Sequence, residues 1–422
     1  MCVKFHDEEN RLEIIGGAIA VHPGEFVKNS KTLMTYRNRW FSQIMKQFKL
    51  YKHIKKIISY CIIAFVLVGT VGCQKTNRFE TSDEVDFYVL GSDGIIGYQF
   101  NDEKLNEITK TDIKIINTNI NPVVHRSELL NQYLVFTEED FPGRNKQSLV
   151  SIDFNTGLIH RYQTDHCAYT SSGTSHNYYF ATTTGENSFI SIYTPELEEV
   201  EYLKLEKDML FSDFITSSDK VYTIGTEVEA TEVENGKNYF KNILISISEN
   251  DGAFSIDTIK EIGANKEKQY FFNDVITKGN YLYAVSAGWR DLDSLEKIYA
   301  GAIYRYDLVN ETSEFYTIEE IFPSDIYDIG DDFLAISHES ITIDKLGFTI
   351  FNYETLQSKF VDISSYAISE NERIVDIKRL DLNHLLLLTE NQLIVYDILK
   401  GTITLQLKCD DTLGTVFHIW IN

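Results

Sequence analysis

The sequence has little proline, little tryptophan and comparatively few basic residues. Of 422 residues, 5 are Pro and 3 are Trp, and 39 Lys and Arg stand against 63 Asp and Glu, which gives a formal net charge of −24. So acidic a surface repels phosphate and excludes nucleic-acid binding through basic patches. The chain is nevertheless 43% hydrophobic, with 25 Tyr and 26 Phe. It has enough apolar surface to fold, which excludes intrinsic disorder.

Catalytic signatures are missing as well. The sequence contains no G-x-S-x-G, H-E-x-x-H or C-x-x-C motif, no P-loop, and no G-x-G-x-x-G after a strand. His160, His166 and His176 lie closest together among the histidines, but their spacing fits no metal site. The acids are too numerous for two of them to be chosen as glycosidase carboxylates. The sequence thus favours a binding protein and leaves the question of enzymatic activity open.

An apolar run follows a cluster of lysines near the N-terminus. Five lysines follow Met45 and precede the mostly apolar residues 57–72, which end in small residues just before Cys73. This order is typical of a secretory signal. A membrane-spanning helix is the alternative, but sixteen residues reach only about 24 Å, short of the roughly 30 Å hydrocarbon core.

The end of this run, Gly69-Thr70-Val71-Gly72-Cys73, resembles the lipobox of bacterial lipoproteins, except that Thr70 stands where Leu is usual. The resemblance implies cleavage before Cys73 and lipidation of its thiol and new amine, and two acyl chains anchor a protein firmly. We therefore expect an extracytoplasmic protein anchored to the cell membrane by Cys73. Residues 45–72 are the expected signal peptide, 73–83 a tether, and 1–44 an over-extended N-terminus.

Removal of residues 1–72 makes the chain still more acidic. These residues hold 11 Lys and Arg and 5 Asp and Glu, which leaves 28 basic and 58 acidic residues and a net charge of −30. Such a domain stays soluble and avoids anionic lipid head groups. Cys167 and Cys409 would be its only cysteines besides Cys73. Two separate buried thiols are favoured over a disulfide between them.

Short strands rich in Val, Ile, Tyr, Phe and Thr recur from Glu84 onward, with turn residues between them and no long segment of helical periodicity. One unit occurs seven times, each with a strand, a polar turn and a second strand. The first strands of these pairs lie at residues 97–100, 151–154, 191–194, 246–249, 304–307, 350–353 and 394–397. Their mean spacing of about 49 residues is the period of a propeller blade.

A second element recurs upstream in four of the units: an apolar stretch with an Asp, a turn, and a Tyr- or Leu-rich strand. It occupies residues 212–222, 273–283, 324–334 and 375–386. We interpret it as the innermost (A) strand, a hairpin turn and the next (B) strand of blades 4 to 7.

The first unit has no A strand before its B-like strand at residues 86–92, whereas residues 415–422 match the A-strand pattern. The sequence therefore predicts an all-β fold over residues 84–422, a seven-bladed β-propeller closed by its C-terminal strand. A pair of β-sandwiches is the alternative, which the regular repeat disfavours.

The strand pattern and turns such as Asp153-Phe154-Asn155-Thr156-Gly157 resemble the broad class of bacterial seven-bladed propellers that includes YncE-like, quinoprotein-like and WD40-like domains. The resemblance covers most of residues 84–422 and identifies no subfamily. Residues 84–422 lack the Trp-Asp dipeptides of WD40 repeats, the double glycines of kelch repeats, the Asp-box of sialidases and the repeated tryptophans of quinone-binding dehydrogenases.

Inner strands line the central channel of a propeller, so the polar residues repeated in them are candidate ligand-binding residues. Asp213, Asp274, Asp325 and Asp376 occupy equivalent positions in blades 4 to 7, His418 does so in blade 1, and Arg126 or His125 in blade 2. Clustered carboxylates could bind Ca²⁺ or a polyamine, and no other cofactor is expected. The favoured alternative is structural: each Asp accepts hydrogen bonds from the backbone of a neighbouring strand.

Three connections between the second and third strands of a blade are long, at residues 137–147, 226–241 and 287–300. The last two belong to adjacent blades and should emerge side by side. Trp289 and Arg290 would form an exposed pair there, suited to a carbohydrate or peptide. Solvated acidic loops without a ligand are the alternative.

Together these features predict an extracytoplasmic, lipid-anchored, monomeric propeller that acts as a binding or scaffolding module for a protein or a cell-envelope glycan. The alternative is an extracytoplasmic enzyme that works at the channel mouth with the repeated Asp residues. It would be a carboxylate-dependent glycan hydrolase or lyase, or a lactonase-like hydrolase.

Overall fold

The computed structural model describes residues 78–422 apart from residues 102, 117–125, 139–147, 164–169, 174–176, 184–187, 218–219, 228–230, 234–236, 265–266 and 295. The predicted signal peptide and the lipidation of Cys73 lie outside the described residues, as do His125 and Cys167. The chain divides into two compact units, Met1–Gln74 and Lys75–Asn422, and the second contains all the described residues. Within them, no helix is both long enough and apolar enough to cross a membrane.

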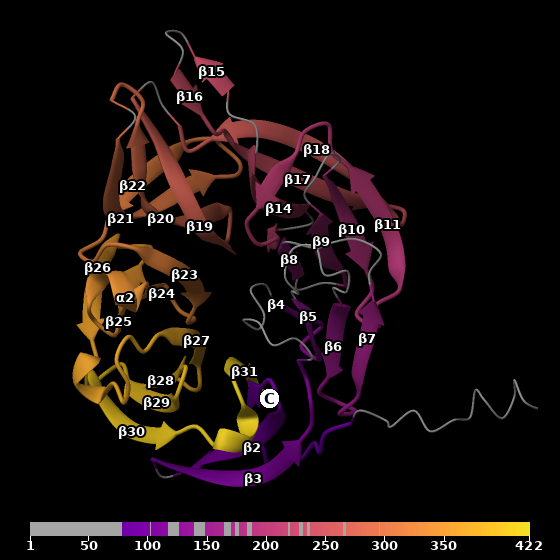
Figure 1. Cartoon of the computed structure of the whole chain (residues 1–422), viewed down its shortest axis with the longest axis vertical. Helices are drawn as coiled ribbons and strands as arrows, with labels where there is room; N and C mark the ends of the chain where they lie inside the picture. The colour runs from indigo at the N-terminus through magenta and orange to yellow at the C-terminus, as the bar shows by residue number, and fades with distance from the viewer. Residues whose placement is uncertain are drawn as a thin grey trace, which may run out of the picture. The chain divides into compact units, whose positions relative to one another are not determined.

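The unit from Lys75 to Asn422 is an all-β, seven-bladed propeller (Figure 1). Each blade is an antiparallel sheet, and we letter its strands A to D from the channel outward. From A to D, blade 1 consists of β31 (Val416–Ile421), β1 (Phe87–Gly91), β2 (Gly94–Asn101) and β3 (Lys104–Asp112). Blade 2 consists of β4 (Arg126–Leu129), β5 (Tyr133–Glu138), β6 (Ser148–Asp153) and β7 (Ile159–Gln163). Blade 3 consists of β8 (Thr170–Gly173), β9 (Tyr179–Thr183), β10 (Phe189–Tyr193) and β11 (Glu199–Lys204).

Blade 4 has a divided A strand, and blades 5 to 7 have four strands each. Blade 4 consists of β12 (Met209–Phe211), β13 (Ile215–Ser217), β14 (Lys220–Glu227), β17 (Asn242–Asn250) and β18 (Ala253–Ile262), and blade 5 of β19 (Lys268–Lys278), β20 (Tyr281–Asp291), β21 (Lys297–Asp307) and β22 (Ser313–Thr317). Blade 6 consists of β23 (Pro323–Asp328), β24 (Phe333–His338), β25 (Gly347–Asn352) and β26 (Gln357–Asp362). Blade 7 consists of β27 (Ile374–Arg379), β28 (His384–Thr389), β29 (Gln392–Asp397) and β30 (Thr402–Lys408).

Short elements occupy some of the connections. A hairpin of β15 (Thr231–Val233) and β16 (Lys237–Tyr239) joins the B and C strands of blade 4, and α2 (Ser340–Ile343) joins those of blade 6. Two 3-10 turns, η1 (Ser364–Tyr366) and η2 (Asp411–Leu413), follow the D strands of blades 6 and 7.

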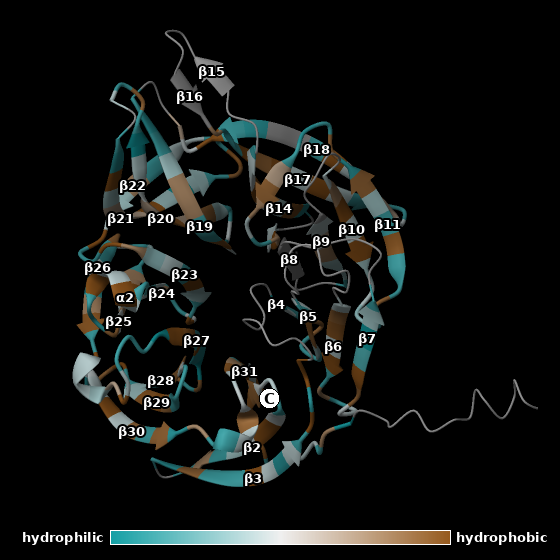
Figure 2. Ribbon diagram, in the orientation of Figure 1, coloured by the Kyte–Doolittle hydropathy of each residue, from teal (hydrophilic) through white to brown (hydrophobic). Residues whose placement is uncertain are grey.

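The core lies within and between the blades. The middle strands are buried on both faces, as in β1 and β29, whereas outer strands such as β3 are mostly exposed. Figure 2 shows the same contrast, with hydrophobic residues on middle strands such as β10 and a largely hydrophilic β3. Because each blade packs against two neighbours, the ring needs no single central core, and a chain of this length folds as one unit.

The C-terminal strand closes the ring, as predicted. β31 pairs antiparallel with β1, with Tyr88 opposite Trp420 and Leu90 opposite His418. In Figure 1 the yellow β31 lies among the indigo strands of blade 1. Trp420 is 3% exposed and stacks on Phe154 of blade 2 at a centroid distance of 4.1 Å. The last strand therefore contributes to the cores of two blades.

Residues 78–83, predicted as part of the tether, pack against the propeller instead. Phe79 is 3% exposed and contacts the rings of Tyr88 and Phe154. Its N–H donates to the carbonyl oxygen of Gly157 at 2.9 Å. A Cβ at Gly157 would lie 2.2 Å from the Phe79 oxygen, so this contact requires glycine. The predicted start of the domain at residue 84 is thus too late.

The segment at residues 287–300 was predicted as a loop, and this is wrong. β20 continues to Asp291 and β21 begins at Lys297, so the segment is an extended hairpin. The aromatic and β-branched residues on its strands favour this ladder.

We predict that Trp420→Ala in the full chain destabilises the whole propeller by about 3–5 kcal/mol, because it leaves a cavity at the closure between blades 1 and 2. The thermal midpoint of unfolding, followed by near-ultraviolet circular dichroism, should fall clearly. Leu382→Ala is the matched control, since Leu382 is 81% exposed. Equal midpoints for the two variants would contradict closure by β31.

Candidate functional site

A cavity of about 290 Å³ lies among the inner strands of six blades. Its lining residues are Arg126, Ser127, Glu128, Asp213, Asp274, Asp325, Ile326, Tyr327, Asp376, Lys378 and His418. It therefore brings together the four repeated Asp residues, His418 and Arg126, from blades 1, 2 and 4 to 7. These candidate positions thus line one cavity.

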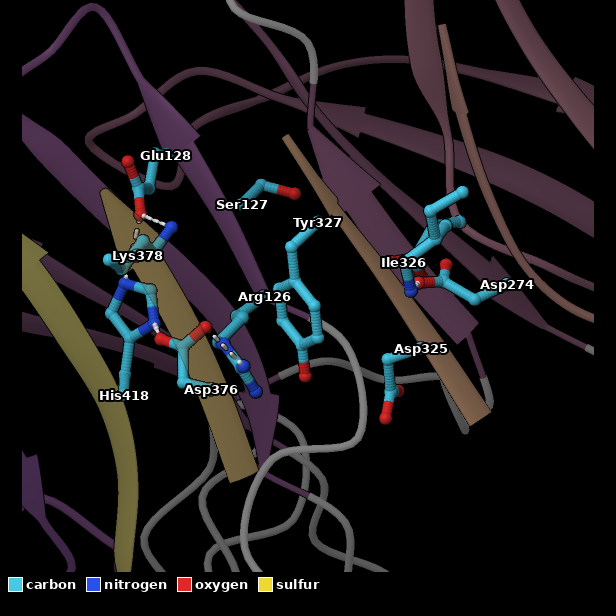
Figure 3. Close-up of a pocket in the computed structure, with 11 residues that line it drawn as sticks. Arg126, Ser127, Glu128, Asp274, Asp325, Ile326, Tyr327, Asp376, Lys378 and His418 are labelled. Atoms are coloured by element: carbon cyan, nitrogen blue, oxygen red, sulfur yellow. Dashed lines mark hydrogen bonds and ion pairs between the residues drawn. The ribbon is translucent and has the colours of Figure 1, made fainter. Parts of the chain in front are cut away.

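One side of the cavity holds a connected set of charged side chains, shown with dashed contacts in Figure 3. Arg126 of blade 2 pairs with Asp376 of blade 7 at 3.2 Å, and Lys378 of blade 7 pairs with Glu128 of blade 2 at 2.5 Å. His418 of blade 1 lies between them, with Nδ1 2.7 Å from Asp376 Oδ2 and Nε2 3.1 Å from Glu128 Oε1. We call these five residues the ion-pair clamp, because they join blade 7 to blade 2 across blade 1.

Mutual attraction favours the charged forms of Asp376, Glu128 and Lys378. Burial alone would raise the pKa of Asp376, but Arg126, Lys378 and His418 hold it well below its usual range. Burial within the ring also acts to raise the pKa of Glu128, yet Lys378 and His418 lower it to about 2. Burial would lower the pKa of Lys378, and Glu128 and Asp376 raise it instead. Each charge is thus stabilised by an opposite charge from another blade.

The other side of the cavity is lined by three carboxylates, those of Asp213, Asp274 and Asp325. Burial raises the pKa of Asp274 well above its usual range, and the charges of Asp213 and Asp325 add to the increase. Asp325 Oδ2 accepts a hydrogen bond from the Ser337 hydroxyl at 2.9 Å. Within the described residues, neither Asp274 nor Asp325 forms an ion pair with Lys, Arg or His. This side is therefore the electrostatic opposite of the clamp.

Two of the repeated Asp residues also hold neighbouring strands together. Asp274 Oδ2 accepts from the Ile326 N–H of the next blade at 2.9 Å, and its Oδ1 accepts from the N–H of the residue that follows it. Asp376 repeats this pattern toward Ile419 of blade 1, also at 2.9 Å. The structural interpretation of the repeat is thus confirmed at these two positions. Their carboxylates still line the cavity while they fix the register between blades.

Asp213 lies at the break in the A strand of blade 4, between β12 and β13. At this break the Ser212 N–H donates to the Ile224 carbonyl at 2.8 Å, and the Ser212 hydroxyl accepts from the Ile224 N–H at 3.1 Å. A side chain therefore replaces part of the backbone ladder and leaves Asp213 facing the cavity.

Tyr327 stands between the two sides of the cavity (Figure 3). Its hydroxyl donates to the Val375 carbonyl of blade 7 at 3.4 Å. Burial, reinforced by the nearby Asp325, raises the pKa of Tyr327 far above its usual range. The phenol is therefore neutral and offers a polar, uncharged edge between the clamp and the three carboxylates.

The sequence analysis missed Glu128, Tyr327 and Lys378. Each lies two residues after a predicted site residue, namely Arg126, Asp325 and Asp376. Because side chains alternate along a strand, residues i and i+2 face the same side. This period would have identified all three as channel residues.

Trp289 and Arg290 do not belong to the cavity and do not form the predicted exposed pair. Both are half-buried in β20. The Trp289 ring lies beside Tyr270 at 5.9 Å and beneath the Lys268 ammonium at 4.2 Å. Residues of β19, the strand paired with β20, thus already contact the Trp289 ring that the prediction assigned to a ligand.

The described residues include no group of three or more His, Cys, Asp or Glu side chains placed to hold a metal ion. Binding of Ca²⁺ at the repeated Asp residues therefore stays a prediction. Cys409 is a free, half-buried thiol, and burial raises its pKa to about 12, which keeps it protonated and unreactive.

No protein-family model and no curated protein matches the chain. Among solved structures, BamB from Moraxella catarrhalis is 9% identical with a TM-score of 0.44, and the alignment covers 80% of this chain and 89% of that one. AztD from Citrobacter koseri is 10% identical (TM-score 0.42), with 81% and 88% covered. The Pan2 WD40 domain of Neurospora crassa is 10% identical (TM-score 0.47), with 78% and 87% covered. Nothing about partners or activity transfers from these likenesses to this chain.

We predict that the clamp makes the free energy of unfolding decrease as the pH falls from about 4.5 toward 2. Unfolded Glu128 takes up its proton near pH 4.5, whereas folded Glu128 does so only near pH 2. The unfolded state thus binds more protons in this window, so the contribution is full above about pH 4.5 and is lost as the pH falls toward 2. Glu128→Gln should destabilise the protein at pH 7 by on the order of 1 kcal/mol, since the side chain is 40% exposed.

The difference in thermal midpoint between the wild type and Glu128→Gln should therefore shrink between pH 6 and pH 3. Glu206→Gln removes the same charge from an exposed connection and serves as the control. A difference that stays constant across this range would show that Glu128 is not held ionised by the clamp.

Proposed function

We propose that this chain is an extracytoplasmic, lipid-anchored propeller that acts as a protein-binding module, with the central cavity receiving a cationic side chain of its partner. The observation that carries the proposal is the uneven charge of one cavity. Five carboxylates line it, against the two permanent cations Arg126 and Lys378. The clamp uses both cations, which leaves the side of Asp274 and Asp325 as the place where an incoming positive charge is stabilised.

A lysine or arginine of a partner protein fits this place better than a neutral sugar. Its charged group sits on a flexible arm, which can reach an inward-facing carboxylate, and charge-assisted hydrogen bonds are about twice as strong as neutral ones. An arriving cation would also lower the high pKa of Asp274, because an opposite charge favours the ionised form. The acidic surface of the whole chain would attract basic partners from a distance and speed association.

The cellular address in this proposal rests on sequence alone. The order of basic, apolar and small residues that ends at Cys73 supports export and lipidation. The net charge of −30 that remains after residue 72 suits a domain that stays in solution beside an anionic membrane surface.

The test uses the peptide acetyl-Gly-Lys-Gly-amide and its norleucine counterpart, titrated into the full chain by calorimetry. Only the lysine peptide should bind, and its affinity should fall as NaCl rises, because the attraction is electrostatic. The double variant Asp213→Asn/Asp325→Asn should weaken binding by about tenfold or more, which corresponds to about 1.4 kcal/mol.

Asp332→Asn is the charge-matched control, because Asp332 lies on an exposed turn of blade 6 away from the cavity. Binding of the norleucine peptide as tightly as the lysine peptide would refute a cationic ligand. Equal affinity of the double variant and Asp332→Asn would refute the central cavity as its site.

A second candidate function is a carboxylate-dependent hydrolase, and the contrast between Asp274 and Glu128 favours it. One cavity holds a carboxyl group whose pKa is raised and another whose pKa is lowered to about 2. Such a contrast is typical of an acid and base pair. If the chain is an enzyme, Asp274→Asn should lower turnover of soluble envelope glycan or a lactone by at least about a hundredfold. Asp274→Asn also removes one of the two backbone hydrogen bonds that Asp274 accepts, so some loss of stability is expected and turnover is measured on the folded variant, well below its melting temperature. Turnover that survives the substitution would exclude this role for Asp274.

A further inference from the structure

A second cavity, of about 150 Å³, lies between two connections at one end of blades 6 and 7. One wall is formed by α2 and the residues after it, from Ser340 to Leu346. The other is formed by residues 364–372, which lead from blade 6 to blade 7. No residue of this cavity lines the central one. It is thus a separate feature, and the function proposed above does not use it.

The deepest wall is held rigidly by Glu372, which is 2% exposed. Its carboxylate accepts hydrogen bonds from Ile368 N–H at 2.8 Å, Gln392 Nε2 at 3.2 Å and Thr389 Oγ1 at 2.5 Å. These donors come from the connection itself and from both middle strands of blade 7. A buried carboxyl group with this many donors fixes the local backbone, so the cavity is formed before any ligand arrives.

Ser340 is the unusual residue of this cavity. Its side chain lines the space, the residue is only 5% exposed, and its hydroxyl has no hydrogen-bond partner within the described residues. Buried hydroxyls are nearly always paired, because an unpaired one loses its hydration without compensation. The Ser340 hydroxyl therefore points to a missing partner inside the cavity.

Asp344, Lys345 and Glu372 also line the space. Lys345 pairs with Glu320 at 2.6 Å, and Glu372 accepts the three hydrogen bonds described above. The uncharged polar groups define the chemistry of the partner. The Ser369 hydroxyl accepts from Asn391 and keeps its own proton to donate, and Asn371 is exposed beside it. Hydroxyl and amide groups offer donors and acceptors together, which suits a ligand rich in hydroxyl groups. The apolar lining is limited to Leu346 and Ala367, too little for a pocket that takes a hydrophobic side chain.

The size of the cavity restricts the ligand further. Pockets for free small molecules usually measure about 300–1,000 Å³, and this one is about half the lower limit. It fits one unit of a longer chain that continues across the surface. Ile341 is 57% exposed and Tyr366 is 39% exposed, and each is next in sequence to a lining residue. They supply apolar surface for the neighbouring units.

We propose that this cavity, which we call the Ser340 subsite, binds one neutral sugar ring of a glycan chain. A sugar ring offers several hydroxyl groups for Ser340, Ser369 and Asn371, and its C–H faces can pack on exposed apolar side chains. Binding here is independent of the cationic site in the central cavity. The chain then holds a protein and a glycan at separate places.

The experiment uses two soluble probes, N-acetylglucosamine trisaccharide and maltotriose, with the full chain, in saturation-transfer NMR and calorimetry. At least one should bind with a millimolar Kd that changes little between 50 and 500 mM NaCl, because the ligand is neutral and the proposed contacts come from hydroxyl and amide groups. Ser340→Ala should weaken binding by about threefold to tenfold, the usual effect of one neutral hydrogen bond. It should leave the melting temperature unchanged or raised, since the hydroxyl has no partner to lose.

Ser151→Ala is a closely matched control. Ser151 lies in β6, is fully buried, and its hydroxyl also lacks a hydrogen-bond partner within the described residues, but it lines neither cavity. It should change stability in the same sense as Ser340→Ala and leave sugar binding unchanged. Ala367→Leu fills the subsite from its exposed rim and should abolish sugar binding without altering the response to the lysine peptide.

Four results would overturn the proposal. The first two are no binding of either sugar at 20 mM, and equal sugar affinity of Ser340→Ala and the wild type. The third is a lower melting temperature for Ser340→Ala than for Ser151→Ala. The fourth is loss of lysine-peptide binding in the Ala367→Leu variant. The last would assign the cavity to a protein partner. If the wild type binds a sugar but not the lysine peptide, the function proposed for the central cavity is refuted and this subsite remains.

Discussion

The closure of the ring is specified by the ion-pair clamp as well as by the pairing of β31 with β1. His418 arrives with the last strand of the chain and lies between Asp376 and Glu128. Arg126 and Lys378 complete the two pairs between blades 7 and 2, about 250 residues apart in sequence. Buried ion pairs contribute little net stability, since desolvation offsets their attraction. Their value here is specificity: only one placement of β31 satisfies all four charged partners.

The clamp explains why a repeating scaffold has an asymmetric cavity. Asp274 and Asp376 occupy the same position in their blades and accept the same backbone hydrogen bonds. Their pKa values nevertheless move in opposite directions, because Asp376 faces Arg126 and Asp274 faces other carboxylates. The repeat therefore sets the position of the acid, and the neighbouring blades set its protonation. A site on such a ring is defined by where the repeat is broken.

Sequence periodicity predicted what repetition determines. The seven strand pairs, the closing strand and the six converging channel residues all follow from one recurring pattern. Pairings that occur once were beyond it: nothing in the spacing of Glu128 and Lys378 shows that they meet from blades 2 and 7. Phe79 was missed for the same reason, since its place depends on the single glycine at position 157. The extended hairpin of blade 5 was mistaken for a loop because its extra strand residues occur in this blade and are not part of the pattern that repeats from blade to blade.

The two cavities differ in the force that each would use, and this difference matters for a protein so acidic. An attraction between charges reaches across a Debye length and weakens with salt, so the central cavity would select a partner during approach. Hydroxyl contacts act only at hydrogen-bond distance and are insensitive to salt, so the Ser340 subsite would hold a ligand only after contact. A protein with the function proposed above would gain from this division. Weak neutral contacts repeated along a glycan keep it in place by effective concentration, while the charged cavity remains available to a protein that diffuses past.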